Sequence, residues 1–400
     1  MRVVEPQSGT VRRALTPIVW CMVAFCIDGL QLVTYGQSPQ PQPPTDLHPS
    51  PVIKSISLAT APDRVFPSTG EMWFTTWADD DNLYGTWGDG SGPTAFISWS
   101  LMTDCGIAKF AGDPPKLKPT IVLRDAPTQF EPRVDDKPSS VLFIDGRLYG
   151  YFHSPLGDPR IGYLAYSDDY GQSWVRVGYY LPDAPRTPAG SPWIKDFDSA
   201  LPSLPFINQI VPRMYDDTSL HDSPFRCLFF INMGKNYELN TDGYVYGLGI
   251  GRERNWSGEV YLARVSQKHI LRYDDWEYYA GPGADGKPSW SKSQMYAKPL
   301  PGLYTTEQGS AIYHPGVKRY LFLTSKHLFD APEPWGPWTV AGDFPTEPPE
   351  WQKGEQPGII TKGLGADSFW FTIAGQGKKP NLTSSFHVGQ MVMHLTSPRP

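Results

Sequence analysis

The stretch Glu71–Gly90, EMWFTTWADDDNLYGTWGDG, groups carboxylates in a pattern that suits acid–base chemistry. Its acidic residues are Glu71, Asp79, Asp80, Asp81 and Asp89. From residue 65 to residue 108 the chain has no Lys, Arg or His to balance them. Because neighbouring carboxylates repel, one is expected to hold a proton while another stays ionised. Such a pair can protonate a leaving oxygen and activate water, which is the chemistry of glycoside hydrolysis.

A β-hairpin brings two of these acids together. We predict that MWFTTWA and NLYGTWGD are antiparallel strands joined by a loop of three aspartates. The facing pairs are then Trp77 with Leu83, Trp73 with Trp87, and Glu71 with Asp89, all on one face of the hairpin. Mutual repulsion and shielding by the tryptophans raise the pKa of one carboxyl, so we predict Glu71 and Asp89 as the catalytic acid–base pair. A solvated strand end is the alternative for both.

The composition indicates an all-β protein. With 42 Pro and 38 Gly in 400 residues, long helices are repeatedly interrupted, and 14% of the residues are aromatic. The 35 Lys and Arg against 41 Asp and Glu form no basic block, which argues against a nucleic-acid partner. No metal-ligand motif and no complete dinucleotide- or phosphate-binding motif occurs, so we expect no cofactor and no metal. An axial calcium ion has no supporting ligand spacing.

One short pattern, a turn residue followed by an apolar and aromatic strand, recurs along the chain. It occurs as DDNLY from Asp80, DGRLY from Asp145, DGYVY from Asp242, HPGVKRY from His314 and ADSFW from Ala366. Five hairpins in roughly 320 residues suggest propeller blades of about 60 to 70 residues with long loops. We predict a five-bladed β-propeller of four-stranded antiparallel blades with its binding site on the axis. A β-sandwich with five hairpins is the alternative.

The segment SDDYGQSW, Ser167–Trp174, resembles the Asp-box of sialidase-type propellers. In that motif the Asp and Gly form a tight hairpin turn and the Trp packs between strands, so its role is architectural. We expect Trp174 and Trp338 to lie in the core.

The N-terminus has the features of an export signal. Arg12 and Arg13 precede the apolar run Ile18–Ile27 and a small-residue cleavage site, so residues 1–36 are predicted to be a signal peptide. The Pro-rich segment 37–52 is predicted to be a disordered linker, and residues 53–400 a single catalytic domain. We expect a secreted, periplasmic or cell-surface monomer without a membrane span in the mature chain. An uncleaved anchor is the alternative.

Two cysteines, Cys105 and Cys227, lie outside the predicted signal. They form either one disulfide or two buried thiols, because the sequence does not show whether they meet.

The run GEMWFTTWADDDNLYGTWGDG resembles the first-blade signature of a family long described as a domain of unknown function, which includes endo-D-arabinanases. Other similar stretches are FINMGKNY, DGYVYGLGIG, VYLARVSQKHI, AIYHPGVKRYLFLT, DAPEPWGPWT and DSFWFTIAG, so the resemblance extends from about Ile56 to Thr396. It implies a five-bladed propeller glycosidase acting on mycobacterial D-arabinan, with Glu71 and Asp89 as the catalytic pair. The family usually has Asp at the first position. The longer Glu71 bears on the substrate and on the choice between inverting and retaining chemistry.

The predicted substrate-binding residues are Trp73, Trp77, Asp80, Trp87, Asn232, Lys235, Asp242 and Glu307. The first-blade tryptophans offer flat faces for sugar stacking, with core packing as the alternative. Asp80 is either a ligand or an ordinary hairpin former. Asn232, Lys235 and Asp242 lie in stretches that resemble the family's third blade. Glu307 is either a separate general acid or an exposed loop residue.

Three function classes follow. The leading one is an exported glycoside hydrolase that cuts furanoside linkages in a polysaccharide, most similar to an endo-D-arabinanase. A non-catalytic carbohydrate-binding propeller is the alternative, favoured by Glu71 in place of Asp. A structural surface or interaction protein is the third.

Overall fold

The described residues are almost entirely β-strands. The computed structural model describes residues 47–96, 101–124, 137–153, 162–176, 224–250, 258–305, 307–345, 354–375 and 385–397. Within these ranges lie strands β1 to β24 and a few short 3-10 helices, without an α-helix. The prediction of an all-β protein is confirmed.

The first two antiparallel blades follow one another along the chain. Blade 1 consists of β2 (Thr69–Glu71) and β3 (Thr75–Trp77), which both pair with β4 (Leu83–Gly92), and then β5 (Gly106–Ala111) and β6 (Lys118–Arg124). Blade 2 consists of β7 (Lys137–Ile144), β8 (Arg147–His153), β9 (Gly162–Ser167) and β10 (Val175–Arg176).

Blades 3 and 4 share one sheet. Blade 3 contains β11 (Cys227–Asn232), β12 (Tyr244–Ile250), β14 (Tyr261–Ser266), β15 (Glu277–Pro282) and the additional strand β16 (Pro288–Ser291). Blade 4 contains β18 (Ser310–His314), β19 (Arg319–Leu323), β20 (His327–Ala331) and β21 (Thr339–Asp343). A parallel pairing of β11 with β18 joins the two blades, and the short β13 (Gly258–Glu259) and β17 (Tyr304–Thr305) pair with each other.

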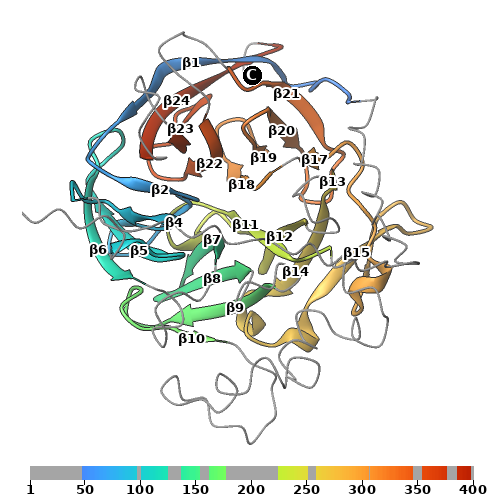
Figure 1. Cartoon of the computed structure of the whole chain (residues 1–400). Coiled ribbons are helices and arrows are strands. Elements are labelled where there is room, and N and C mark those ends of the chain that lie inside the picture. Colours follow the sequence, from blue (N-terminus) through green and yellow to red (C-terminus); the bar gives the residue numbers. More distant parts are fainter. Residues whose placement is uncertain are drawn as a thin grey trace, which may run out of the picture. The chain divides into compact units, whose positions relative to one another are not determined.

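The two ends of the described chain meet in blade 5. It contains β22 (Gly354–Ile360), β23 (Ser368–Gly375), β24 (Ser385–Leu395) and β1 (Ile53–Arg64), which pairs with β24 as the outer strand. The first strands of the blades surround the axis: β3 contacts β7, β7 contacts β11, β11 pairs with β18, β18 contacts β22, and β22 contacts β3 (Figure 1). This closed ring of sheets is a β-propeller.

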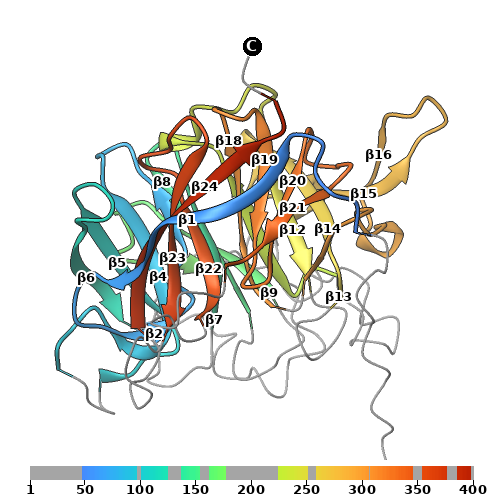
Figure 2. The same ribbon diagram turned by 90° about the horizontal axis from the view of Figure 1, so that it is seen from above.

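The inner strands give this propeller two functionally distinct faces. We call the face where β2, β7, β11, β18 and β22 begin the N-face, and the face where the inner strands end the C-face. Figure 2 shows the blades side-on, with their strands running between these faces. Because neighbouring inner strands run in the same direction, as the parallel β11–β18 pair does, residues that precede them gather on the N-face.

Each recurring turn pattern lies between the first and second strands of a blade. DDNLY connects β3 to β4, and DGYVY leads into β12. In both, the Asp side chain closes the turn by accepting a backbone N–H two residues on and a tyrosine hydroxyl four residues on. Asp80 binds Tyr84 at 2.9 Å, and Asp242 binds Tyr246 at 2.7 Å. The pattern therefore encodes hairpin geometry.

The segment Ser167–Trp174 forms a compact turn. The Asp169 carboxylate accepts hydrogen bonds from Ser173 N at 2.8 Å and Ser173 Oγ at 2.5 Å. Trp174 donates its Nε1–H to Gly171 O at 3.1 Å and is buried. Trp174 and Trp338 lie in the core, as predicted.

The two cysteines are separate buried thiols rather than a disulfide. Cys227 lies at the start of β11, and its burial raises the pKa of the thiol to about 12.

Most of the predicted N-terminal segments lie outside the described residues. The signal peptide, 1–36, lies wholly outside them, and the linker, 37–52, is described only from residue 47. There the chain runs beside β21, with Ser50 N bonded to Val340 O at 2.9 Å and Val340 N bonded to His48 O at 2.8 Å. An isolated bridge between Pro49 and Val340 therefore precedes the regular pairing of β1. Nowhere in the described ranges is a helix long and apolar enough to cross a bilayer.

Candidate active site

The first-blade hairpin has the predicted register only near its turn. Trp77 faces Leu83 as predicted, whereas Glu71 faces Gly88 and not Asp89. The chain bulges in between, because Met72 and Asp89 adopt left-handed backbone angles, with φ of 57° and 51°. The bulge is fixed by Thr86, whose hydroxyl donates to Met72 O at 2.7 Å. The direct pairing of Glu71 with Asp89 was therefore wrong by one position.

Trp73 and Trp87 do not form the walls of a binding pocket. Both are completely buried, stacked at 6.1 Å with an interplanar angle of 27°, in a core shared with β23 and β24. Each uses its Nε1–H internally, towards Gly70 O and Gly90 O. Trp87 also covers Gly106, where an added Cβ atom would lie 2.1 Å from the indole ring. The prediction that Trp73 and Trp87 contact sugar was therefore wrong, because both rings pack in the core.

Glu71 and Asp89 nevertheless share one electrostatic environment on the N-face. The pKa of Glu71 is raised to about 7, first by burial and then by the charges of Glu355 and Asp89, while Lys137 opposes the shift. A hydrogen bond with Glu355 also favours the protonated form of Glu71. The predicted raised pKa is present, but Glu355 contributes more to it than Asp89 does.

Glu355 comes from blade 5, at the start of β22. The next residue, Gln356, anchors this strand to the first blade by accepting a hydrogen bond from Met72 N at 3.0 Å. Glu355 therefore reaches Glu71 from the opposite end of the sequence. Sequence reasoning missed it, since a Glu in GEQPG carries no local signature of chemistry.

The cation that balances Asp89 also comes from another blade. Lys137, the first residue of β7, forms salt bridges with Asp89 and, at 2.8 Å, with Asp104. The Asp89 side chain is 44% exposed and the Lys137 side chain 15%. Asp89 is thus a solvent-accessible carboxylate paired with a cation from blade 2, although nearby sequence offers no partner for it.

Glu307 joins the same face from blade 4. Burial raises the pKa of this carboxyl, and the charge of Glu355 adds to the shift, while its hydrogen bond from Ser325 N opposes it. Its neighbour Gln308 lies against Met72, with Nε2 3.6 Å from Sδ. We call Glu71, Asp89, Glu307 and Glu355, with Lys137, the carboxylate cluster.

The remaining predicted ligands lie on the C-face. Asn232 is buried and ties blades together, accepting from Thr76 Oγ1 at 2.8 Å and donating to Val141 O at 3.2 Å. Lys235 pairs with Asp81 at 3.1 Å and lies 5.7 Å from the Trp77 ring centroid. Trp77, Asp80, Asn232, Lys235 and Asp242 are therefore separated from the carboxylate cluster by the length of the inner strands.

Lys362, like Lys235, pairs with Asp81 on the C-face. It donates to Asp81 O at 2.7 Å and pairs with the Asp81 carboxylate and with Asp113, each at 3.1 Å. Hydrogen bonds from Lys235 and Lys362 hold the pKa of Asp81 below its usual value. The loop aspartates thus link blades 1, 3 and 5, which explains their lack of nearby sequence cations.

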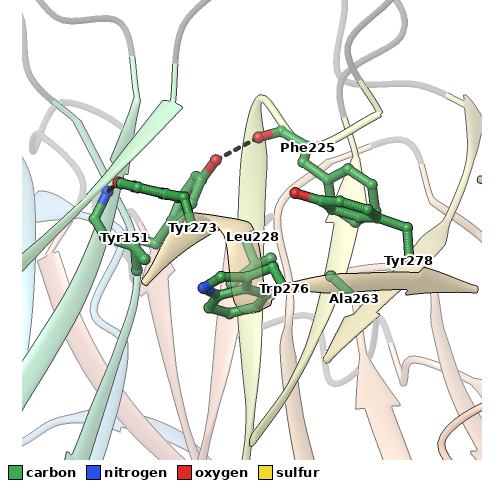
Figure 3. A pocket seen from close by; sticks show the side chains of 8 residues that line it. Tyr151, Phe225, Leu228, Ala263, Tyr273, Trp276 and Tyr278 are labelled. Carbon is green, nitrogen blue, oxygen red and sulfur yellow. Dashed lines mark hydrogen bonds between the residues drawn. The ribbon is translucent and has the colours of Figure 1, made fainter. Parts of the chain in front are cut away.

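A small cavity lies apart from both groups, between blades 2 and 3 (Figure 3). It is lined by Tyr151, Leu164, Phe225, Leu228, Ala263, Tyr273, Trp276 and Tyr278. Its volume of about 20 Å³ suits one water molecule and not a sugar. Among the described residues, no group of three or more His, Cys, Asp or Glu side chains has an arrangement that could hold a metal ion.

Comparison with known proteins gives only distant structural similarity. No family model and no curated protein sequence matches the chain. A GH43_1 enzyme from Xanthomonas citri is similar at 13% identity and a TM-score of 0.45, over 83% of this chain and 89% of that one. A GH43 beta-xylosidase/alpha-arabinofuranosidase from a compost metagenome has 11% identity and a TM-score of 0.46, over 86% and 98%. Similarity at this level carries no inference about activity.

Proposed function

We propose that this chain is a secreted glycoside hydrolase that cleaves furanoside linkages in a polysaccharide, with arabinan as the first candidate substrate. The carboxylate cluster on the N-face carries the proposal. It contains Glu71, whose pKa is raised to about 7, and Asp89, which pairs with Lys137, and side chains from four blades converge there. The residues 70–90 that resemble the arabinanase signature support the substrate class.

The proposed mechanism divides the two roles by environment. Glu71, half-buried beside Glu355, keeps its proton to near neutral pH and donates it to the leaving glycosidic oxygen. Asp89, paired with Lys137, accepts a proton from the attacking water or attacks the sugar carbon itself. Glu355 acts through Glu71 as a positioning residue. Glu307, half-buried and with a raised pKa, is a second carboxyl at this site.

A reducing-end assay on soluble arabinan, with xylan in parallel, tests this proposal. We expect product from the wild-type chain and a rate about 100- to 10,000-fold lower for Asp89→Asn, because the amide cannot accept a proton. Asp145→Asn, at an exposed turn on the C-face, is the matched control and should retain the full rate.

Binding without any product would favour the non-catalytic carbohydrate-binding propeller instead. The Glu71–Glu355 hydrogen bond supports that second candidate, because it engages the proposed acid in a contact within the protein.

A further inference from the structure

A second group of side chains with ligand-binding chemistry lies on the C-face, between blades 3 and 4. It contains the part-exposed rings of Tyr244, Trp290, Tyr313, Tyr320 and Trp335, which we call the aromatic surface. The rings come from β12, β16, the β18–β19 hairpin and the loop after β20, and these blades are neighbours in Figure 1. The carboxylate cluster on the N-face contributes nothing to it.

The aromatic surface is held in a fixed shape. The guanidinium of Arg264 lies 3.8 Å from the centroid of Trp290 and 4.3 Å from that of Tyr244. Arg264 is itself fixed by Glu277 at 2.8 Å. A cation packed against two rings holds both at defined angles. The surface is therefore organised before any ligand arrives.

Two of the rings form a corner. The centroids of Trp290 and Trp335 are 6.4 Å apart, and their planes meet at 87°. Tyr246 is buried beneath them, 6.4 Å from each ring centroid. A perpendicular pair of indoles presents one flat face and one edge, which suits the apolar face and the rim of a sugar ring.

Carboxylates stand beside the rings. Glu333 and Asp242 are exposed, and their charges, together with burial, raise the pKa of Tyr320, so the two acids lie close to that ring. Asp242 is oriented by Tyr244 N at 2.9 Å and by the hydroxyl of Tyr246 at 2.7 Å. Carboxylates of this kind accept hydrogen bonds from sugar hydroxyls.

The charge balance selects against acidic ligands. The cation of Arg264 is compensated by Glu277, while Asp242 and Glu333 have no cation within salt-bridge distance among the described residues. Lys292 also pairs with Glu277, at 3.7 Å, so a phosphate or sulfate polymer would meet two carboxylates, Asp242 and Glu333, that no described cation pairs with. A neutral polyhydroxylated chain meets flat rings and hydrogen-bond acceptors.

We propose that the aromatic surface binds a neutral oligosaccharide segment, separately from the carboxylate cluster. This site rests on the proposed substrate class but not on hydrolysis. It holds a polysaccharide at one face while another segment reaches the N-face, which increases the local concentration of cleavable linkages.

Affinity electrophoresis in soluble arabinan and in xylan tests the surface independently of turnover. The Glu71→Gln chain should be retarded by one of these polysaccharides. Addition of Trp335→Ala should weaken binding about tenfold, the loss of one stacked ring. Glu333→Gln, at an exposed position, should weaken it less, and Tyr296→Ala, whose ring is 68% exposed outside the surface, should leave it unchanged.

Several outcomes overturn the inference. These are no binding to either polysaccharide, binding unaffected by both Trp335→Ala and Glu333→Gln, or a dimer in gel filtration that Trp335→Ala converts to monomers. If Trp335→Ala fails to fold, as judged by its thermal transition, the binding of Glu333→Gln and of Trp335→Phe tests the surface instead. Absence of hydrolysis by the wild-type chain, with binding still lost in Trp335→Ala, would reject the proposed enzyme and retain the surface.

Discussion

Glu71→Gln is expected to lose activity and gain stability at the same time. Without a proton to donate, hydrolysis should slow about 100- to 10,000-fold. Between pH 4.5 and about 7 the folded chain retains a proton on Glu71 that the unfolded chain has released, because folding raises this pKa. Wild-type stability therefore falls as pH rises through this window, and the variant avoids that loss.

The melting temperature measured from pH 4 to pH 8 checks the second half of this prediction. The advantage of Glu71→Gln should be absent below pH 4.5 and largest above pH 7. Glu238→Gln, an exposed substitution of the same kind on the C-face, should change neither activity nor the pH dependence. A variant that melts lower than wild type at pH 8 would show that Glu71 is a structural acid.

The largest stability effect is expected in blade 4. Asp330 is fully buried and pairs with Arg319 at 2.6 Å, while Thr339 Oγ1 donates to its other oxygen at 2.7 Å. Asp330→Ala leaves the guanidinium buried without its anion. Breaking one half of a buried pair costs about 3 to 5 kcal/mol. Equilibrium unfolding in urea measures this loss.

Asp343→Ala is the matched control in the same blade. Asp343 pairs with His327 at 3.0 Å, but its side chain is 86% exposed, so its loss should cost below about 1 kcal/mol. Replacing both members, as Arg319→Met with Asp330→Leu, should recover most of the stability. If the unfolding free energy of Asp330→Ala lies within about 1 kcal/mol of the wild-type value, the buried pair does not make the predicted contribution to stability.

The propeller architecture could be predicted because short local sequence patterns mark its hairpins. Each recurring turn is followed by a short apolar and aromatic run, and in two of them, DDNLY and DGYVY, the Asp caps the hairpin and a Tyr bonds back to it. Five such turns fall at the first hairpin of each blade in the described chain. What local patterns could not give was the bulge at Met72, where Thr86 bonds to the backbone and shifts Glu71 by one position.

Only part of the candidate site could be predicted from the sequence, because its residues come from several blades. Glu71 and Asp89 stood out as acids within one hairpin. Glu355 and Lys137 reach them from other blades, and no spacing in the sequence links those positions. The residues predicted from later stretches, such as Asn232, lie at the ends of inner strands and not at their beginnings. Polar character alone does not distinguish the two faces of a propeller.

The tryptophans show a related limit. A Trp on a strand suits both a sugar and a core, and the first-blade pair Trp73 and Trp87 is buried. Two part-exposed rings, Trp290 and Trp335, come from distant parts of the sequence and are brought together by the contact of two blades.

The pH dependence of kcat/KM on a cleavable polysaccharide, for wild type and Glu355→Gln, tests the central claim most directly. If Glu71 is a general acid whose proton is retained by burial and by Glu355, the wild-type rate falls above a pH of about 7. Removing the Glu355 charge should move that alkaline limb to lower pH, although burial keeps it above 4.5. A wild-type profile without this limb, or a limb that stays in place in Glu355→Gln, would contradict the account.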